Sequence, residues 1–257
     1  MHLSQQFFKV NMLNKHKILD ELPKNRVDLQ LFENIDSTNE ECKRIHQNKD
    51  FHVVIAEQQT MGKGRLGKNW SSPSSGNVYM SIYSKELPKN IPLSLLVGLI
   101  CVETLNSMIK NGSIGLKWPN DMLLDKKKIG GILVEKEIMG KDINNIVGIG
   151  INLNHPEKED WWGDLYKLGI HLRRDELINK ILHGYIKFYD NGISDWQKLW
   201  HKHCVHLNHE IKIKQNNNII NEGIFLGINA DGSLNLKMKN NEEMKYEHGE
   251  ISIEGIY

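Results

Sequence analysis

The chain has 257 residues, which is enough for one large domain or for a domain with a small appendage. Its 33 lysine and arginine residues against 32 aspartate and glutamate residues leave a formal net charge of +1, which argues against a nucleic-acid-binding protein that depends on bulk electrostatic attraction. Three scattered cysteines without a C-x-x-C pair argue against a disulfide framework. The sequence shows neither a bilayer-spanning apolar run nor a signal-peptide core, so we expect a cytoplasmic protein.

The first half of the chain predicts a mixture of strands and helices. The first thirty or so residues are weakly patterned and have room for one short helix. Alternating or β-branched apolar residues predict strands, and apolar residues at helical spacing predict helices. Ser37 and Glu40 have the spacing of a capping box at a helix start. The elements expected up to residue 110 are strands at 27–35, 52–57 and 77–84 and helices at 36–47 and 92–110.

The second half predicts more strands, two helices and a change of character near residue 205. Gly140 marks one of the expected hairpins. From Leu207 onward, short alternating segments are separated by turn signals such as Asp231-Gly232, which is typical of a small all-β module. The elements expected before this module are strands at 114–118, 121–125, 128–138 and 145–154 and helices at 172–192 and 194–204.

The segment "MGKGRLGKNW", residues 61–70 and called the glycine loop below, matches two phosphate-binding motifs at once. It fits the G-x-G-x-x-G of dinucleotide-binding folds and the opening of the G-x-x-x-x-G-K P-loop. Both motifs need a helix directly after the glycines, because the helix N-terminus holds the phosphate. Here "NWSSPSSGN" follows, which does not start a long helix, and Asn69 stands where a P-loop has Ser or Thr. We reject both motifs and predict a strand-to-strand loop that presents its cations to an anion.

Further polar residues lie at expected strand ends close to glycines. Asn120 and Asp121 follow Trp-Pro in a turn, where their oxygen atoms suit a hydrated Mg²⁺, a ribose or a triphosphate. Lys128 precedes two glycines at a strand start, and Asn152 ends another strand. Each alone is typical of an ordinary turn or a solvated charge. Their recurrence together with the glycine loop indicates a binding site.

Five motifs in one order and spacing resemble those of biotin protein ligases, the enzymes that attach biotin to carboxylase carrier domains. The resemblance runs from about Leu31 to the C-terminus, and it includes "HGEIS" in the β module. The motifs are "STN" (37–39), "QTMGKGRLGKNW" (59–70), "KWPND" (117–121), "KIGGILVE" (128–135) and "GIGINLN" (148–154).

The resemblance implies an α+β fold of the class II synthetase and biotin–lipoate ligase type, in which helices cover one side of a mixed sheet. A small all-β SH3-like domain follows it. It implies an N-terminal extension at 1–30, a catalytic biotin- and ATP-binding domain at 31–205 and the SH3-like domain at 206–257. The implied reaction uses ATP and Mg²⁺ to convert biotin to biotinyl-5′-AMP and pyrophosphate. A lysine of the biotin carboxyl carrier protein of acetyl-CoA carboxylase then takes the biotinyl group.

The resemblance also assigns site residues, each by its place in a motif. The implied catalytic residues are Arg65 and Lys128, and the implied metal ligand is Asp121 for Mg²⁺. Biotin is expected to meet Ser37, Thr38, Asn39, Gln59, Gly62, Lys63, Gly64, Arg65, Lys128, Gly130 and Gly131. ATP and the adenylate are expected to meet Arg65, Trp70, Asn120, Lys128, Asn152 and Trp162, with Trp161 as a competitor for the adenine.

The sequence departs from the family pattern at two places. The usual loop reads G-R-G-R, whereas Lys63 stands at the first basic position, and lysine is a point charge rather than a planar fork. Only about thirty residues precede "NIDSTN", fewer than the winged helix-turn-helix of bifunctional members needs, so we expect no DNA binding. The resemblance also allows a homodimer built through sheet edges.

Three alternatives stay open at this point. A lipoate or octanoyl protein ligase shares the reaction type and a related scaffold, although "KWPND" and the glycine loop favour biotin. A biotin-responsive repressor would be a binding protein first. A catalytically dead adenylate-binding module would keep the pocket without the chemistry.

The residues themselves suit the implied chemistry. Biotin carboxylate and the α-phosphate of ATP are both anions, so Lys63, Arg65 and Lys128 with Mg²⁺ would reduce their repulsion and stabilise charge on the phosphate. No protein nucleophile is needed, because biotin is the nucleophile. A mobile glycine loop would keep water from the adenylate. The sequence shows no obvious base for the transfer step, for which Lys128 or Asp121 are the candidates.

Overall fold

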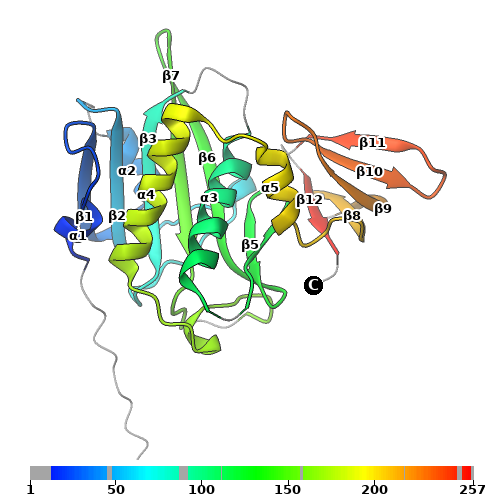
Figure 1. Ribbon diagram of the computed structural model, residues 1–257, viewed down its shortest axis with the longest axis horizontal. Coiled ribbons are helices and arrows are strands. Elements are labelled where there is room, and N and C mark those ends of the chain that lie inside the picture. The colour runs from blue at the N-terminus through cyan, green and yellow to red at the C-terminus, as the bar shows by residue number, and fades with distance from the viewer. Residues whose placement is uncertain are drawn as a thin grey trace, which may run out of the picture.

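The computed structural model describes residues 13–44, 48–86, 92–110, 112–156, 159–216, 218–247 and 251–255. Within these residues there are two sheets, one of seven strands and one of five. The helices pack mainly on the larger sheet (Figure 1). The α+β class expected from the sequence is therefore confirmed, as is the all-β character of the C-terminal region. No helix within these described ranges is both long and apolar enough to cross a membrane.

The larger sheet is mixed, with the strand order β1-β2-β3-β7-β6-β5-β4. β1 and β2 run parallel, while every other neighbouring pair is antiparallel. A parallel pair needs a crossover, and α2 supplies it. The strands are β1 (Val27–Ile35), β2 (Phe51–Gln59), β3 (Val78–Lys85), β4 (Gly115–Lys117), β5 (Asp121–Leu124), β6 (Lys127–Met139) and β7 (Asp142–Ile151).

Helices cover both faces of this sheet, so the expectation of helices on one side only is wrong. Along β2, Val53 and Ile55 point into the main core with α3 and α4, whereas Val54 points the other way, towards Cys42 of α2. The cause is the alternation of side chains along a strand, since β2 is apolar at both sets of positions. The helices are α1 (Lys15–Ile18), α2 (Thr38–Arg44), α3 (Leu93–Met108), α4 (Arg174–Asn191) and α5 (Trp196–His203).

The smaller sheet is antiparallel throughout, with the order β11-β10-β9-β8-β12. Its apolar face shares one continuous core with the larger unit, where Trp200 of α5 packs near Phe225 and the indole of Trp118 donates to the Gly232 carbonyl at 3.0 Å. The expected boundary between residues 205 and 206 stays a prediction. The strands are β8 (Glu210–Gln215), β9 (Asn218–Ile228), β10 (Leu234–Met238), β11 (Glu243–Tyr246) and β12 (Ile251–Glu254).

Two local expectations can be compared directly with the structure. The glycine loop joins the antiparallel neighbours β2 and β3, and residues 71–77, all of which the structure describes, form no α-helix, as expected when both phosphate-loop motifs were rejected. At the start of α2, the expected capping box of Ser37 and Glu40 is not formed, because the Ser37 amide donates to Asp36 Oδ1 at 2.7 Å and the Glu40 carboxylate bonds to Lys43 and Lys63. Residues 45–47 of the expected helix, residues 1–12 of the expected extension and 248–250 of "HGEIS" lie outside the described residues.

Candidate active site

The glycine loop folds back on itself as a short hairpin. The Gly64 amide donates to the Lys68 carbonyl at 2.7 Å, and the Trp70 amide donates to the Gly62 carbonyl at 2.9 Å. A Cβ on Gly62 would stand 2.4 Å from the Trp70 carbonyl oxygen, so only glycine fits there. Leu66 at the tip has left-handed backbone angles and a side chain that is 58% exposed. The loop is thus a compact strap rather than an extended connection.

A cavity beneath this strap collects most of the residues predicted from the sequence. Gly62 instead lines an adjoining hollow under the loop. Gly130 packs inside the sheet, where a Cβ would stand 2.5 Å from the Met122 Cε and 2.8 Å from the Gly150 carbonyl oxygen. The predicted residues that line the cavity are Ser37, Thr38, Asn39, Gln59, Lys63, Gly64, Arg65, Trp70, Asn120, Asp121, Lys128, Gly131, Asn152 and Trp162.

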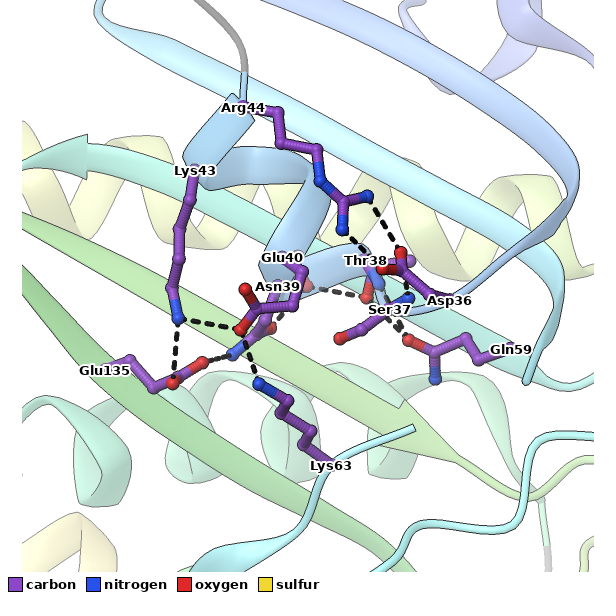
Figure 2. A network of polar contacts seen from close by, with 11 residues as sticks. Asp36, Ser37, Thr38, Asn39, Glu40, Lys43, Arg44, Gln59, Lys63 and Glu135 are labelled. Atoms are coloured by element: carbon purple, nitrogen blue, oxygen red, sulfur yellow. Dashed lines mark hydrogen bonds and ion pairs between the residues drawn. The ribbon is translucent and has the colours of Figure 1, made fainter. Parts of the chain in front are cut away.

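One end of the cavity is built from uncharged hydrogen-bonding groups at the start of α2. The Gln59 Oε1 accepts from the Thr38 amide at 2.9 Å and from the Thr38 hydroxyl at 3.1 Å, while its Nε2 donates to the Ser72 hydroxyl at 2.8 Å. These three bonds fix which way the Gln59 amide faces, and Figure 2 shows its oxygen directed towards Thr38. Ser37 and Thr38 are both buried, so their polar groups are held in a water-poor wall.

Asn39 is oriented at the same end by residues that the sequence reasoning missed. Its Nδ2 donates to Glu135 Oε2 at 2.6 Å, and its Oδ1 accepts from the Ser81 hydroxyl at 2.5 Å. A Cβ on Gly148 would lie 2.5 Å from that Oδ1, so glycine is required for the amide to fit. Glu135 ends the motif "KIGGILVE" and Gly148 begins the motif "GIGINLN", so the motifs pointed to their segments. Nothing in the sequence singled out Ser81.

The other end of the cavity is cationic. The Lys128 Nζ lies 2.7 Å from Asp121 Oδ1 and 5.2 Å from the centre of the Trp70 ring, over its face. The Lys128 backbone is held as well, because its amide donates to the Trp161 carbonyl and its carbonyl accepts from the Gly163 amide, both at 2.9 Å. Both the backbone of Lys128 and the direction of its ammonium group are therefore fixed.

Arg65 reaches the same end from the glycine loop. Its Nη1 donates to Asn120 Oδ1 at 3.3 Å, and its Nη2 donates to the Ile251 carbonyl at 3.2 Å. Burial lowers the pKa of the Arg65 guanidinium, and the nearby Asp121 carboxylate opposes that effect. An arginine stays charged under such a shift, so the site places two cations beside one carboxylate and suits an anionic ligand.

Aromatic rings form the rim beside the cations. Trp162 lies edge-on to His155 at 5.1 Å and to Trp161 at 5.4 Å between ring centres, and all three line the cavity. Trp161 is 56% exposed, whereas Trp162 is partly buried. Trp70 lies against β7, where a Cβ on Gly150 would stand 2.6 Å from its Cε2. The site thus offers flat apolar surface next to positive charge.

Three more residues complete the description. Asn152 is buried, its Nδ2 donates to the Gly163 carbonyl at 3.3 Å, and its Oδ1 has no hydrogen-bond partner within the described parts of the chain. Ser252 of β12 lines the cavity and was missed, although "HGEIS" pointed to its segment. Lys117, within the motif "KWPND", does not line the cavity but lies close enough to Asp121 and Lys128 for their charges to act on it. Burial lowers its pKa to about 8, an effect that the Asp121 carboxylate opposes and Lys128 reinforces.

Comparison with known proteins gives one consistent result. Residues 31–152 match the model of the Biotin/lipoate A/B protein ligase family. The bifunctional ligase/repressor BirA of Escherichia coli is 32% identical over 246 residues, covering 89% of this chain and 74% of that protein. The biotin–[acetyl-CoA-carboxylase] ligase of Mycobacterium tuberculosis is 32% identical over 115 residues, 42% of either chain. The structure of a biotin protein ligase from Aquifex aeolicus in complex with biotin and ATP superposes with a TM-score of 0.74 at 27% identity, covering 89% of this chain and 99% of that one.

Proposed function

The chain belongs to the biotin/lipoate A/B protein ligase family, and we infer that it is a biotin protein ligase. It activates biotin with ATP to biotinyl-5′-AMP and transfers the biotinyl group to a lysine of a carboxylase carrier protein. The observation that carries this inference is the two-ended cavity. Uncharged hydrogen-bonding groups stand at one end, two cations stand at the other, and one glycine loop spans both.

The uncharged end suits the ureido ring of biotin, which has two N–H donors and one carbonyl acceptor. We propose that Ser37, Thr38, Asn39 and Gln59 bind this ring, because their hydroxyl and amide groups line the cavity in fixed orientations. Burial supports selectivity, since a buried hydrogen-bonding group that a wrong ligand leaves unpaired costs roughly 1–3 kcal/mol. The dithiolane ring of lipoate has no such donors.

In the first step, a biotin carboxylate oxygen attacks the α-phosphorus of ATP, and the bond from that phosphorus to pyrophosphate breaks. Both reactants are anions, so the step needs positive charge at the phosphate. We propose that Lys128 and Arg65 supply it, because both cations lie at one end of the cavity and are held in place before any ligand arrives. Preorganised charge of this kind needs no rearrangement during the reaction. Trp70, Asn152 and Trp162 line the same end and are proposed to hold the nucleotide.

In the second step, a neutral carrier lysine attacks the acyl carbon of biotinyl-5′-AMP. The acyl C–O bond breaks, AMP leaves, and the attacking nitrogen loses a proton. The adenylate must be kept from water until then, and the glycine loop is placed to cover it. We propose that the glycine loop covers the adenylate, while the cations of the loop and of β6 hold it. No protein nucleophile takes part in this proposal.

Mg²⁺ is proposed to enter with ATP rather than to occupy a site made by protein alone. Asp121 is the one carboxylate at the cationic end among the described residues that line the cavity, and it is already paired with Lys128. No group of three or more His, Cys, Asp or Glu residues suited to a metal occurs within the described chain. The Asp121 carboxylate and the unpartnered Asn152 Oδ1 fit an ion that brings phosphate oxygens and water as its remaining ligands. The ion would neutralise phosphate charge.

The remaining partner assignments are also proposals. A biotin carboxyl carrier protein is the proposed acceptor, and the near-neutral charge of +1 supports a protein acceptor rather than DNA. A homodimer through a sheet edge is a further proposal, for which β1 is the edge strand at one side of the larger sheet. We propose a cytoplasmic location, where carboxylases and ATP are found.

Intact mass spectrometry of an apo biotin carrier domain tests the proposed function. The domain is incubated with this protein, ATP, Mg²⁺ and biotin, and in parallel with lipoate. We expect the mass of one biotinyl group to be added, only with ATP and not with lipoate. Addition of lipoyl alone would assign the lipoate activity instead. No addition with either acid, combined with tight biotin binding by calorimetry, would indicate a pocket without the chemistry.

A further inference from the structure

The glycine loop is fastened to α2 by an ion pair outside the proposed reaction. The Lys63 Nζ lies 2.5 Å from Glu40 Oε1, on the first turn of α2 (Figure 2). Lys63 lines the cavity, yet its ammonium group is directed to this carboxylate, whereas Arg65 is directed to Asn120 and Ile251. Lys63 and Arg65 therefore hold the loop to different elements, Lys63 to α2 and Arg65 to β12 and the β4–β5 turn.

The ion pair continues into the uncharged end of the cavity. Glu40 also binds Lys43 at 2.8 Å, Lys43 binds Glu135 at 3.1 Å, and Glu135 accepts from the Asn39 amide at 2.6 Å. Charges alternate along this chain of contacts, so each member stabilises the next. The pKa of the Glu40 carboxyl is lowered by its bonds to Lys43 and Lys63, as expected for a carboxylate that stays ionised between two cations.

We propose that Glu40 is a positioning residue, which holds the glycine loop over the cavity through Lys63 and couples that closure to the orientation of Asn39 through Lys43 and Glu135. This inference rests on the proposed function, in which Asn39 meets biotin and the loop covers the adenylate. It also accounts for lysine at position 63. A point charge on a flexible stem suits a single carboxylate, and the planar fork of arginine is not needed there.

We expect a moderate effect, about threefold to tenfold, because the Glu40 and Lys63 side chains are 27% and 44% exposed and an exposed ion pair contributes little. Glu40→Gln removes the charge and keeps the shape. Glu41→Gln is the matched control, since Glu41 lies on the same helix and pairs with Arg44 rather than with a side chain of the loop. Both variants are first checked for an unchanged melting temperature, within about 2 °C of the unmodified protein.

The first measurement is limited trypsin digestion of the free protein, which does not depend on activity. The loop carries three tryptic bonds, after Lys63, Arg65 and Lys68, and all three remain in Glu40→Gln. We expect cleavage in the loop to be faster by about threefold to tenfold in Glu40→Gln and unchanged in Glu41→Gln. Equal cleavage in all three proteins would overturn the proposal.

The second measurement is the dissociation rate of preformed biotinyl-5′-AMP. Glu40→Gln should release it about threefold to tenfold faster, with a smaller change in the rate of its formation, and the reversed pair Glu40→Lys with Lys63→Glu should recover part of the loss. A merely structural role of Glu40 would not be rescued by charge reversal. If the unmodified protein forms no adenylate, the proposed function fails, while the digestion still decides whether Glu40 holds the loop.

Discussion

The Arg65 guanidinium donates to the backbone carbonyl of Ile251 at 3.2 Å, across a sequence separation of 186 residues. Arg65 belongs to the glycine loop, and Ile251 begins β12 of the smaller sheet. The next residue, Ser252, lines the same cavity. The C-terminal sheet is therefore part of the wall of the candidate active site, and the glycine loop contacts it there.

Replacing Arg65 should separate formation of the adenylate from its retention. In Arg65→Gly, we expect biotinyl-5′-AMP still to form, though more slowly, because Lys128 remains. It should then dissociate about tenfold to a hundredfold faster, because a charge-assisted hydrogen bond worth about 1.5–3 kcal/mol is lost. A filter-binding or fluorescence dissociation assay measures the rate. Arg65→Lys keeps the positive charge without the planar guanidinium fork. Its rate of adenylate dissociation should lie between those of the unmodified protein and Arg65→Gly. Unchanged retention in Arg65→Gly would contradict the role.

Replacing Lys128 should slow the first chemical step itself. Lys128→Ala is expected to lower the rate of pyrophosphate release about a hundredfold or more, because a preorganised charge at the reacting phosphate is removed. Lys136→Ala, on the same strand but 56% exposed and paired with Glu86, is the control and should react normally. Pyrophosphate release by Lys128→Ala at the unmodified rate would exclude the assignment.

A single methyl group at Gly150 should disturb the nucleotide end of the cavity. The added Cβ would stand 2.6 Å from Trp70 Cε2, so the ring must move. Overpacking of this kind costs about 1–3 kcal/mol, and we expect calorimetry to show affinity for ATP or the adenylate reduced by about tenfold or more. Gly98→Ala in α3 is the control, since its nearest contact is the flexible end of Leu116 at 3.3 Å. Equal affinity in both variants would show that Trp70 is free to shift.

The ion pair between Arg174 and Glu57 should stabilise the fold rather than the chemistry. Arg174 contacts both carboxylate oxygens at 2.5 and 2.7 Å, and its side chain is only 8% exposed. Arg174→Met would leave Glu57 charged without its partner and should lower the free energy of unfolding by about 3–5 kcal/mol in urea denaturation. Lys180→Met, which breaks an exposed pair on the same helix, should change it by less than about 1 kcal/mol. A similar loss in both would contradict this reasoning.

Stability should fall as the pH drops below about 6.5, partly through His206. Burial, with a smaller contribution from Lys117, lowers the pKa of His206 from 6.5 to about 3. Between these values the unfolded chain binds a proton that the folded chain does not, so the free energy of unfolding decreases with falling pH by up to about 1.4 kcal/mol per unit. His206→Gln should flatten this slope in denaturation between pH 7 and 5. A residual slope is expected from His52 and His201, whose pKa values burial also lowers. A slope equal to that of the unmodified protein would contradict the assignment.

Local patterns in the sequence were sufficient for the elements and marked part of the candidate site, whereas residues such as Thr38, Gln59 and Trp162 were assigned only through the family resemblance. Alternation along β2 and β3 and helical spacing along α3 and α4 are short-range properties, and the structure places those elements where the patterns predicted them. The glycine loop followed by "NWSSPSSGN" also excluded a helix by local chemistry alone. Cations and amides next to glycines indicated a ligand site because they recur at several strand ends, whereas each alone is typical of an ordinary turn or a solvated charge.

The tertiary structure alone decided which of these residues meet. Three contacts join segments that are separate in the sequence. They are the ion pair of Lys63 with Glu40, the hydrogen bond from Asn39 to Glu135 and the hydrogen bond from Arg65 to the Ile251 carbonyl. Such contacts depend on strand order and on the docking of one sheet against the other, which no local period encodes. The placement of α2 could not be predicted for the same reason. A strand that is apolar on both sides shows that both faces are covered, but not which helix covers which face.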